Sequence, residues 1–453
     1  MLKDLLPKLV TELPGPLSRK LIEKREQAIP SSIACGAPYA IDKAEGCMVR
    51  DLDGNVIMDW VGGIGVMNIG HSNPEVIEAV EKQIKRYFHP QINTFHYAEY
   101  VDLADRLNTI TPGDFKKRTA FFNCGSEAVD NSIKIARKYT KKSDVIAFSG
   151  AFHGRTFMSM TLTSGQIFKA AFAPLAPGVH RVDFPNEYRM DSSISRENLA
   201  EYYLEKLEYM FVDYISPDNV AAIIIEPLQG EGGFIEPPKE YIIGLRKICD
   251  KYNILLIVDE IQTGYCRTGK MFATDYWAEF GVYPDIILTA KSLAAGLPLS
   301  AVTAREEIMQ SLAVGEIGGT YGGNPVAISA ALKVIEIMER DNFAQKALDI
   351  GERCRKSFSE WAAKFDIIGT YRVKGAMTSI EIVKNRETKE PYPEAVSRIL
   401  KECADNGLII KSAGSYNQIV RMLMPLVTNS EQLTTGLGIM EKAIETVESE
   451  LRG

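Results

Sequence analysis

Short apolar runs that stop abruptly at charged residues are the feature that most restricts the fold of this chain. Ile254–Val258 ends at Asp259, and Ile286–Leu288 ends just before Lys291. Runs of this length, rich in isoleucine, leucine and valine, are typical of strands buried on both faces. Three further strand-like runs lie at 119–122, 144–148 and 221–225. Their alternation with helical stretches predicts an α/β fold with a large, mostly parallel sheet.

The ends of two of these runs carry an acid and an amine. The carboxyl ends of strands in an open parallel sheet form its ligand-binding edge, so Asp259 and Lys291 should lie there. They could hold opposite ends of pyridoxal phosphate (PLP), whose ring nitrogen pairs with a carboxylate and whose aldehyde reacts with an amine. Lys291 would then bind the cofactor covalently and act as the catalytic base. Gln262 could hydrogen-bond the ring's phenolic oxygen. The alternatives are an Asp259 that caps the next segment and a lysine exposed to solvent.

The length of 453 residues suggests two domains, or one large domain with a split smaller one. We expect residues 1–64 and 331–453 to form a small α+β domain, and residues 65–330 to form the large cofactor-binding domain. Within the small domain, Asp53-Gly54 predicts a hairpin, and Gly407 predicts the end of a helix over 393–406. The spacing Thr428-Asn-Ser-Glu431 predicts a capping box that opens the last helix.

Bulk properties restrict the partners and the compartment. No apolar run approaches the roughly 18 residues that span a bilayer, and the N-terminus does not resemble a signal peptide. The seven cysteines are scattered, which argues against a disulfide framework or a metal site. A net charge of −7 gives no support for nucleic-acid binding. We therefore expect a cytoplasmic enzyme without metal, nucleic-acid or membrane partners.

Three further segments carry polar groups in turns. Gly125 and Ser126 follow a strand and open a helix, where backbone N–H groups favour a phosphate. In the segment 151–155, Phe152 could lie against an aromatic cofactor and Arg155 could bind a carboxylate. Glu226–Gly233 starts at a strand end and has few apolar residues, as loops around sites do. Taken separately, each segment also fits an ordinary turn, a core phenylalanine, a surface arginine or a solvated loop.

Together these motifs resemble the class III (ω-amino acid) aminotransferases of the fold-type I PLP superfamily, and most closely the 4-aminobutyrate transaminase branch. The resemblance covers nearly the whole chain. It is carried by the motifs Asn123-Cys-Gly-Ser-Glu-Ala128, Ala151-Phe-His-Gly-Arg155, Glu226-Pro-Leu-Gln-Gly-Glu-Gly-Gly-Phe234, Val258-Asp-Glu-Ile-Gln-Thr-Gly264, Thr289-Ala-Lys291 and Gly319-Thr-Tyr-Gly-Gly-Asn-Pro325. Cys124, Phe152 and Met424 depart from the residues that many relatives have, and none of the three touches the core chemistry.

The resemblance implies a role for each matching position. Gly125 and Ser126 would bind the cofactor phosphate, Phe152 would stack on its ring, and His153 and Glu226 would belong to the cofactor site. Thr320 would reach the phosphate of a neighbouring subunit, which implies a homodimer with shared active sites; a dimer of dimers stays open.

The resemblance also implies a substrate pocket. Arg421 would bind the acceptor 2-oxoglutarate, and Glu231 would neutralise that arginine while the donor is bound. Arg155 would hold the distal carboxylate of the donor, and Ile64 would narrow the pocket. We therefore expect transamination of 4-aminobutyrate or 5-aminovalerate, since one methylene changes discrimination by only about 1–3 kcal/mol.

Three other functions remain as alternatives. An amino-acid racemase or epimerase of the same fold would use the same Lys291 and Asp259, although such relatives tend to lack an arginine at position 155. A non-catalytic PLP-binding protein would not need the Lys291–Asp259 pair. A nicotinamide-binding Rossmann protein would require a Gly-x-Gly-x-x-Gly turn after the first strand, which is missing.

Overall fold

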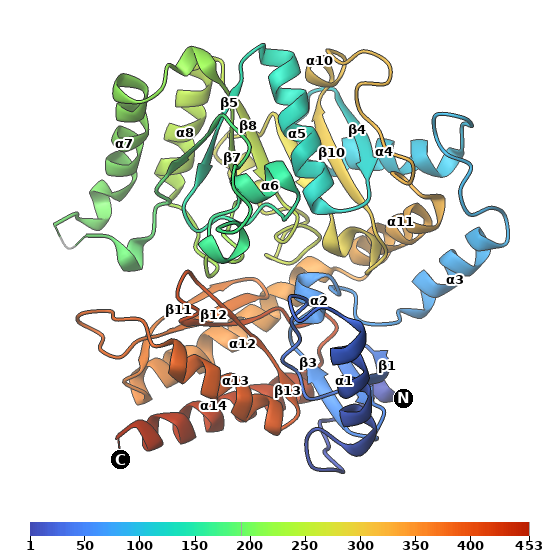
Figure 1. Ribbon diagram of the computed structural model, residues 1–453, viewed down its shortest axis with the longest axis vertical. Helices are drawn as coiled ribbons and strands as arrows, with labels where there is room; N and C mark the ends of the chain where they lie inside the picture. The colour runs from blue at the N-terminus through green and yellow to red at the C-terminus, as the bar shows by residue number, and fades with distance from the viewer. Residues whose placement is uncertain (192, 453) are drawn as a thin grey trace. The chain divides into compact units, whose positions relative to one another are not determined.

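The computed structural model describes residues 1–191 and 193–452, which form two compact units. One unit consists of Met1–Pro74 and Gln345–Gly453, and the other of Glu75–Ala344 (Figure 1). Both boundaries lie further along the chain than the expected 64/65 and 330/331. The second expected boundary would cut α11 (Pro325–Arg340), which belongs entirely to the larger unit. Asn324 caps this helix, because its Oδ1 accepts a hydrogen bond of 2.9 Å from the Val326 N–H.

The larger unit is built on a sheet that, in the described residues, has seven strands. In sheet order these are β4 (Lys117–Phe122), β10 (Ser300–Arg305), β9 (Ile286–Thr289), β8 (Leu255–Asp259), β7 (Val220–Ile225), β5 (Asp144–Phe148) and β6 (Val179–Val182). All pairs are parallel except those of β10, which runs antiparallel to both β4 and β9. The five strands predicted from the sequence are confirmed, whereas β6 and β10 were not predicted.

Helices cover both faces of this sheet because its central strands are apolar on both sides (Figure 1). In β7, Ile223 and Ile225 pack with α7 (Leu199–Asp213) and α8 (Lys239–Tyr252). The alternate residues Ala222 and Ile224 pack with α5 (Gly125–Thr140) on the opposite face. The remaining helices of this region are α3 (Pro74–Ile84), α4 (Ala98–Ile110), α6 (Phe157–Leu162), α9 (Thr274–Ala278) and α10 (Glu306–Met309).

The smaller unit combines both ends of the chain in one sheet. Its strands are β1 (Ile41–Glu45), β2 (Met48–Asp51), β3 (Val56–Asp59) and β13 (Leu408–Ile409). The predicted hairpin at Asp53-Gly54 is confirmed, since β2 and β3 pair antiparallel. The short strand β13 joins β3 in parallel, so the C-terminal segment completes a sheet that the N-terminal segment starts.

A second, antiparallel sheet belongs to the C-terminal segment alone. Its strands, in order, are β11 (Ile368–Lys374), β12 (Met377–Ile382), β15 (Ile419–Met422) and β14 (Lys411–Ala413). The helices of this unit are α1 (Pro16–Ala28), α2 (Gly62–Gly65), α12 (Phe343–Lys364), α13 (Pro393–Asp405) and α14 (Ser430–Arg452). Among the described residues, no helix combines the length and the apolar character needed to cross a bilayer.

The predicted capping box of the last helix is displaced by one residue. The reciprocal bonds join Asn429 and Gln432: the Gln432 N–H donates to Asn429 Oδ1 at 2.9 Å, and the Asn429 N–H donates to Gln432 Oε1 at 3.1 Å. The Thr428 hydroxyl instead donates to the Pro425 carbonyl. An asparagine and a glutamine perform the same exchange as the Ser/Thr–Glu pair, so α14 begins at Ser430, one residue later than the Thr428 cap predicts.

Candidate active site

Asp259 and Lys291 lie at the carboxyl edge of the large sheet. Asp259 is the last residue of β8, and it pairs in register with Leu288 of the neighbouring parallel strand β9. The Glu260 N–H donates to the Leu288 carbonyl at 2.9 Å, so the pairing continues one residue beyond Asp259. Lys291 follows three positions after Leu288. The fold therefore brings the predicted acid and amine to the ends of adjacent strands.

The backbone at Lys291 is in a conformation that side-chain-bearing residues rarely adopt. Its φ is +43°, in the left-handed region, and it opens the 3-10 turn η6 (Lys291–Ala294). Such a conformation costs on the order of 1 kcal/mol for a non-glycine residue and is often found at functional positions. Helix α11 packs against η6 and supports the turn.

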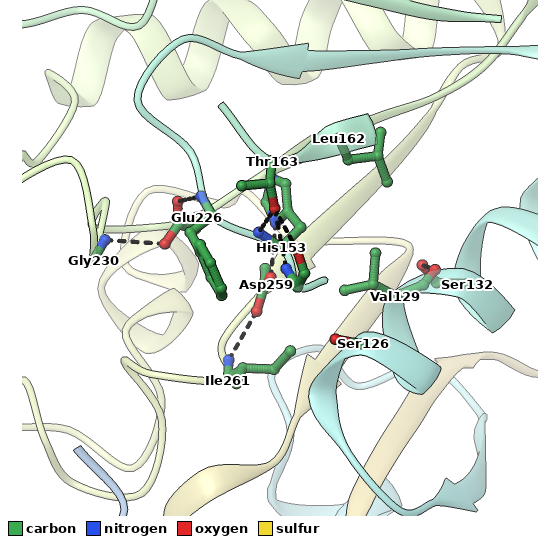
Figure 2. Close-up of polar contacts among 12 residues, drawn as sticks. Ser126, Val129, Ser132, His153, Leu162, Thr163, Glu226, Gly230, Asp259 and Ile261 are labelled. Carbon is green, nitrogen blue, oxygen red and sulfur yellow. Dashed lines mark hydrogen bonds and ion pairs between the residues drawn. The ribbon is translucent and has the colours of Figure 1, made fainter. Parts of the chain in front are cut away.

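Asp259 is buried and hydrogen-bonded on both oxygens (Figure 2). Its Oδ2 lies 2.8 Å from Nδ1 of His153, and its Oδ1 accepts a hydrogen bond of 3.1 Å from the Ile261 N–H. The His153 side chain is fully buried, and its Nε2 has no hydrogen-bond partner in the described part of the chain. The imidazole thus fixes the orientation of the Asp259 carboxylate, as hydrogen-bonding neighbours of functional carboxylates commonly do.

Thr163 holds the loop that carries His153, a role that the sequence did not indicate. Its Oγ1 accepts hydrogen bonds from the N–H groups of His153 (2.9 Å) and Gly154 (3.2 Å) and donates to the Gly154 carbonyl at 2.8 Å (Figure 2). Thr163 directly follows α6, where its side chain can turn back onto the loop. A threonine after a short helix has no sequence signature of this function, so only the fold reveals it.

Glu226 connects two loops beside Asp259. Its Oε2 accepts a hydrogen bond from the Phe152 N–H at 3.2 Å, and its Oε1 accepts one from the Gly230 N–H at 3.0 Å (Figure 2). Burial raises the pKa of Glu226 from 4.5 to about 7, and the negative charge of Asp259 acts in the same direction against the effect of His153. A side chain at Gly230 would collide with Gln262, because a Cβ there would lie 2.3 Å from its Oε1.

The N-terminus of α5 offers donors for an anion. The first-turn N–H groups of Gly125 and Ser126 donate to no group in the described residues, as expected at the start of a helix. Ser126 Oγ accepts a hydrogen bond of 3.2 Å from the Arg155 N–H. Gly154 allows this approach, since a Cβ there would lie only 2.2 Å from Ser126 Oγ. The helix start and the 152–155 loop are therefore in direct contact.

Arg155 is exposed, and its guanidinium lies against aromatic rings. Its Cζ is 5.9 Å from the ring centroid of Phe152 and 4.9 Å from that of Phe168. No carboxylate lies within ion-pair distance of Arg155 in the parts of the chain that the structure describes. The guanidinium can therefore bind an incoming carboxylate without first breaking an ion pair.

The four remaining predicted site residues are divided between the two units. Glu231 is half-buried in the loop after Glu226, and Thr320 is exposed. Ile64 and Arg421 belong to the smaller unit. Ile64 has a φ of +65° and is partly exposed, whereas Arg421 is buried on β15. The predicted exchange between Glu231 and Arg421 therefore joins residues of different units and stays a prediction.

Comparison with known proteins identifies the family. Residues 33–444 match the family described as Aminotransferase class-III. The chain belongs to this family. The class III aminotransferase is 41% identical, over 96% of its length and 97% of the relative, to a protein of Mycobacterium tuberculosis (strain ATCC 25618 / H37Rv) named 4-aminobutyrate aminotransferase. It is 38% identical, over 94% of its length and 98% of the relative, to a 5-aminovalerate aminotransferase of Pseudomonas aeruginosa.

A solved structure supports the same assignment. An amine transaminase from an uncultivated Pseudomonas species, in its PLP-bound form, matches with a TM-score of 0.84 and 27% identity, over 94% of this aminotransferase and 97% of that chain. The expected fold class is confirmed: the aminotransferase has the α/β architecture of fold-type I enzymes, with a large, mostly parallel sheet. Class III aminotransferases depend on PLP in general.

The described residues fit that cofactor chemically. Two buried polar atoms, His153 Nε2 and Gln262 Oε1, have no hydrogen-bond partner in the described part of the chain, so both could bond to a cofactor. An amine, a buried carboxylate and the N–H groups of a helix start match the three functional groups of PLP, namely aldehyde, ring nitrogen and phosphate. Among the described residues, no group of three or more His, Cys, Asp or Glu side chains could hold a metal ion.

Proposed function

We propose that this chain is a PLP-dependent aminotransferase that transfers the amino group of an ω-amino acid, 4-aminobutyrate or 5-aminovalerate, to 2-oxoglutarate. The observation that carries the proposal is the position of Lys291 and Asp259 at the ends of neighbouring strands, with an exposed arginine close to the same loop cluster. The products are glutamate and the semialdehyde of the donor. Relatives at 38–41% identity are named 4-aminobutyrate and 5-aminovalerate aminotransferases, which supports this choice of donors.

Each end of the cofactor has its own group of residues. Lys291 would hold the aldehyde end, Asp259 would pair with the ring nitrogen, and Gly125 and Ser126 would bind the phosphate. Phe152 would stack on the ring, and Gln262 would hydrogen-bond its phenolic oxygen. His153 and Glu226 are buried and would hold these residues in place. His153 is hydrogen-bonded to Asp259, and Glu226 accepts a hydrogen bond from the Phe152 N–H.

Bound PLP supplies an electron sink that makes the carbon bearing the donor's amine acidic. Lys291, once displaced from the aldehyde by the amine of the donor, would take that proton on Nζ and pass it on. Asp259 would pair with the ring nitrogen, and its carboxylate is held in place by the His153 ring at 2.8 Å and by the Ile261 N–H at 3.1 Å. Burial raises the pKa of Glu226 to about 7, so this carboxyl group gains a proton as the pH falls below neutral.

Recognition of the substrate depends on arginines. Arg155 binds the distal carboxylate of the donor, which carries no carboxylate next to its amine. Arg421 binds the carboxylate next to the keto group of 2-oxoglutarate, and Glu231 neutralises Arg421 when the donor is present. Ile64 narrows the pocket. Thr320 of a second subunit completes the phosphate site, so the active enzyme is a homodimer.

The test is a donor screen against 2-oxoglutarate with glutamate formation as the readout. We expect turnover of 4-aminobutyrate and 5-aminovalerate, and none when the keto acid is omitted. An amino-acid racemase would instead change the optical rotation of an L-amino acid without any keto acid. That result, together with no glutamate from either ω-amino acid, would contradict the proposal.

A further inference from the structure

Phe168 contacts two side chains of the 152–155 loop, the ring of Phe152 and the guanidinium of Arg155. It lies in the 3-10 turn η2 (Gln166–Phe168), and its ring meets that of Phe152 edge-on, with centroids 5.4 Å apart and an angle of 76°. The Arg155 guanidinium is closer to Phe168 (4.9 Å) than to Phe152 (5.9 Å). The ring face of Phe168 is thus the main surface against which this arginine rests.

The position of Phe168 is tied to the loop that carries Arg155. The Phe168 N–H donates to the Gly165 carbonyl at 3.3 Å. The next residue, Lys169, is buried and donates from Nζ to the Thr163 carbonyl at 2.8 Å. Thr163 also holds the 153–154 backbone through its hydroxyl. Thr163 is therefore hydrogen-bonded both to the residue that follows Phe168 and to the loop that carries Arg155.

We propose that Phe168 is a positioning residue for the substrate carboxylate: it holds the Arg155 guanidinium in the orientation that binds the ω-carboxylate of the donor. The inference rests on the proposed function, in which Arg155 is that carboxylate's partner. An exposed arginine without an ion-pair partner has many rotamers, and ordering it on binding lowers affinity. An aromatic face that attracts the cation restricts the rotamers before the donor arrives.

The experiment compares Phe168→Leu, which removes the ring, with Phe168→Tyr, which keeps it. Phe172→Leu is the matched control, because Phe172 lies on the same segment and forms no aromatic or cation–π pair in the described residues. In the holoenzyme, Phe168→Leu should raise KM for 4-aminobutyrate and 5-aminovalerate about threefold to tenfold, as expected for a partly exposed cation–π contact. Because the contact acts on binding, kcat should stay within about twofold.

Two measurements separate positioning from a general structural effect. The rate of reaction with butylamine, which has no carboxylate, should be the same in wild type and Phe168→Leu. The inhibition constant of butanoate, which has no amine, should rise by the same factor as KM. The values for Phe168→Tyr and Phe172→Leu should match those of the wild type.

The outcomes distinguish this inference from the proposed function. Wild-type turnover of ω-amino acids, combined with equal losses for butylamine and 4-aminobutyrate in Phe168→Leu, overturns the inference alone. Unchanged KM and butanoate inhibition in Phe168→Leu overturns it as well. A wild type that turns over neither ω-amino acid overturns both.

Discussion

The loop 152–155 contributes to a buried region held by hydrogen bonds and to an exposed region held by cation–π contacts. His153 points into the protein, where it is fully buried and bonded to Asp259. Arg155, two residues later, is exposed and rests on aromatic rings. The buried region depends on hydrogen bonds in a medium of low dielectric constant, where each lost partner is costly. The exposed region depends on weaker contacts that direct one cation. We therefore expect changes in the buried region to affect every donor, and changes in the exposed region to affect only donors with a carboxylate.

The largest effect is expected for Lys291→Ala. Removal of the amine should lower kcat by about 10⁴-fold or more for all donors, because in the proposed function Lys291 is both the covalent anchor and the proton carrier. A coupled assay for glutamate measures this loss, and circular dichroism checks the fold. The variant Lys333→Ala changes a lysine on α11 and should keep full activity. Full turnover in Lys291→Ala would contradict the assignment of the site.

Arg155→Ala tests the exposed region. It should lower kcat/KM for 4-aminobutyrate and 5-aminovalerate by about 10- to 100-fold, which corresponds to a lost hydrogen bond between charged groups. The reaction with butylamine should change by less than about twofold. If both kinds of donor lose activity equally, Arg155 supports the loop and does not bind the donor carboxylate.

Two buried glutamates give a comparison of pH effects. Burial raises the pKa values of Glu226 and Glu260 from 4.5 to about 7. Both groups bind more protons in the folded state, so the stability that they contribute is present below pH 4.5 and is lost as the pH rises to about 7. Glu226→Gln and Glu260→Gln should each reduce this loss of stability, by roughly 2–3 kcal/mol between pH 4.5 and about 7. Thermal unfolding at a series of pH values measures the slope.

The same two variants should differ in activity. Glu226 bonds to the Phe152 and Gly230 backbone beside Asp259, whereas Glu260 accepts hydrogen bonds from Thr263 and Thr274. Only Glu226→Gln should therefore shift the pH profile of kcat/KM. An equal shift in Glu260→Gln would show that the profile reports stability and not the charge of the site.

The smallest effect is expected from a glycine where the two regions meet. Gly154→Ala places a Cβ 2.2 Å from Ser126 Oγ at a backbone φ of +129°, so the loop must move away from the start of α5. We expect a loss of about 1–3 kcal/mol in stability and weaker binding of the cofactor. Gly438→Ala is the control, because a Cβ there meets nothing within 4 Å inside α14 and should stabilise by about 0.5–1 kcal/mol. An unchanged melting temperature in Gly154→Ala would contradict the close contact with Ser126.

The central part of the fold could be predicted because its signals are local. The runs that became β5, β7, β8 and β9 are apolar on both faces, and this pattern is typical of strands that are covered on both sides. The edge strand β6 carries His180 and Arg181 and is only half-buried, so it lacks that pattern. The direction of β10 depends on its two neighbours and has no signal of its own.

For this protein, the sequence alone determined where the strands of the sheet end and which acid and amine lie there. These features follow from the order of apolar and polar residues along single segments. Only the tertiary structure decided that His153 supports Asp259, that Thr163 anchors two segments, and that Phe168 carries the Arg155 guanidinium. Those contacts join positions far apart in the chain, or depend on the direction in which a loop turns, and no local pattern of residues encodes them.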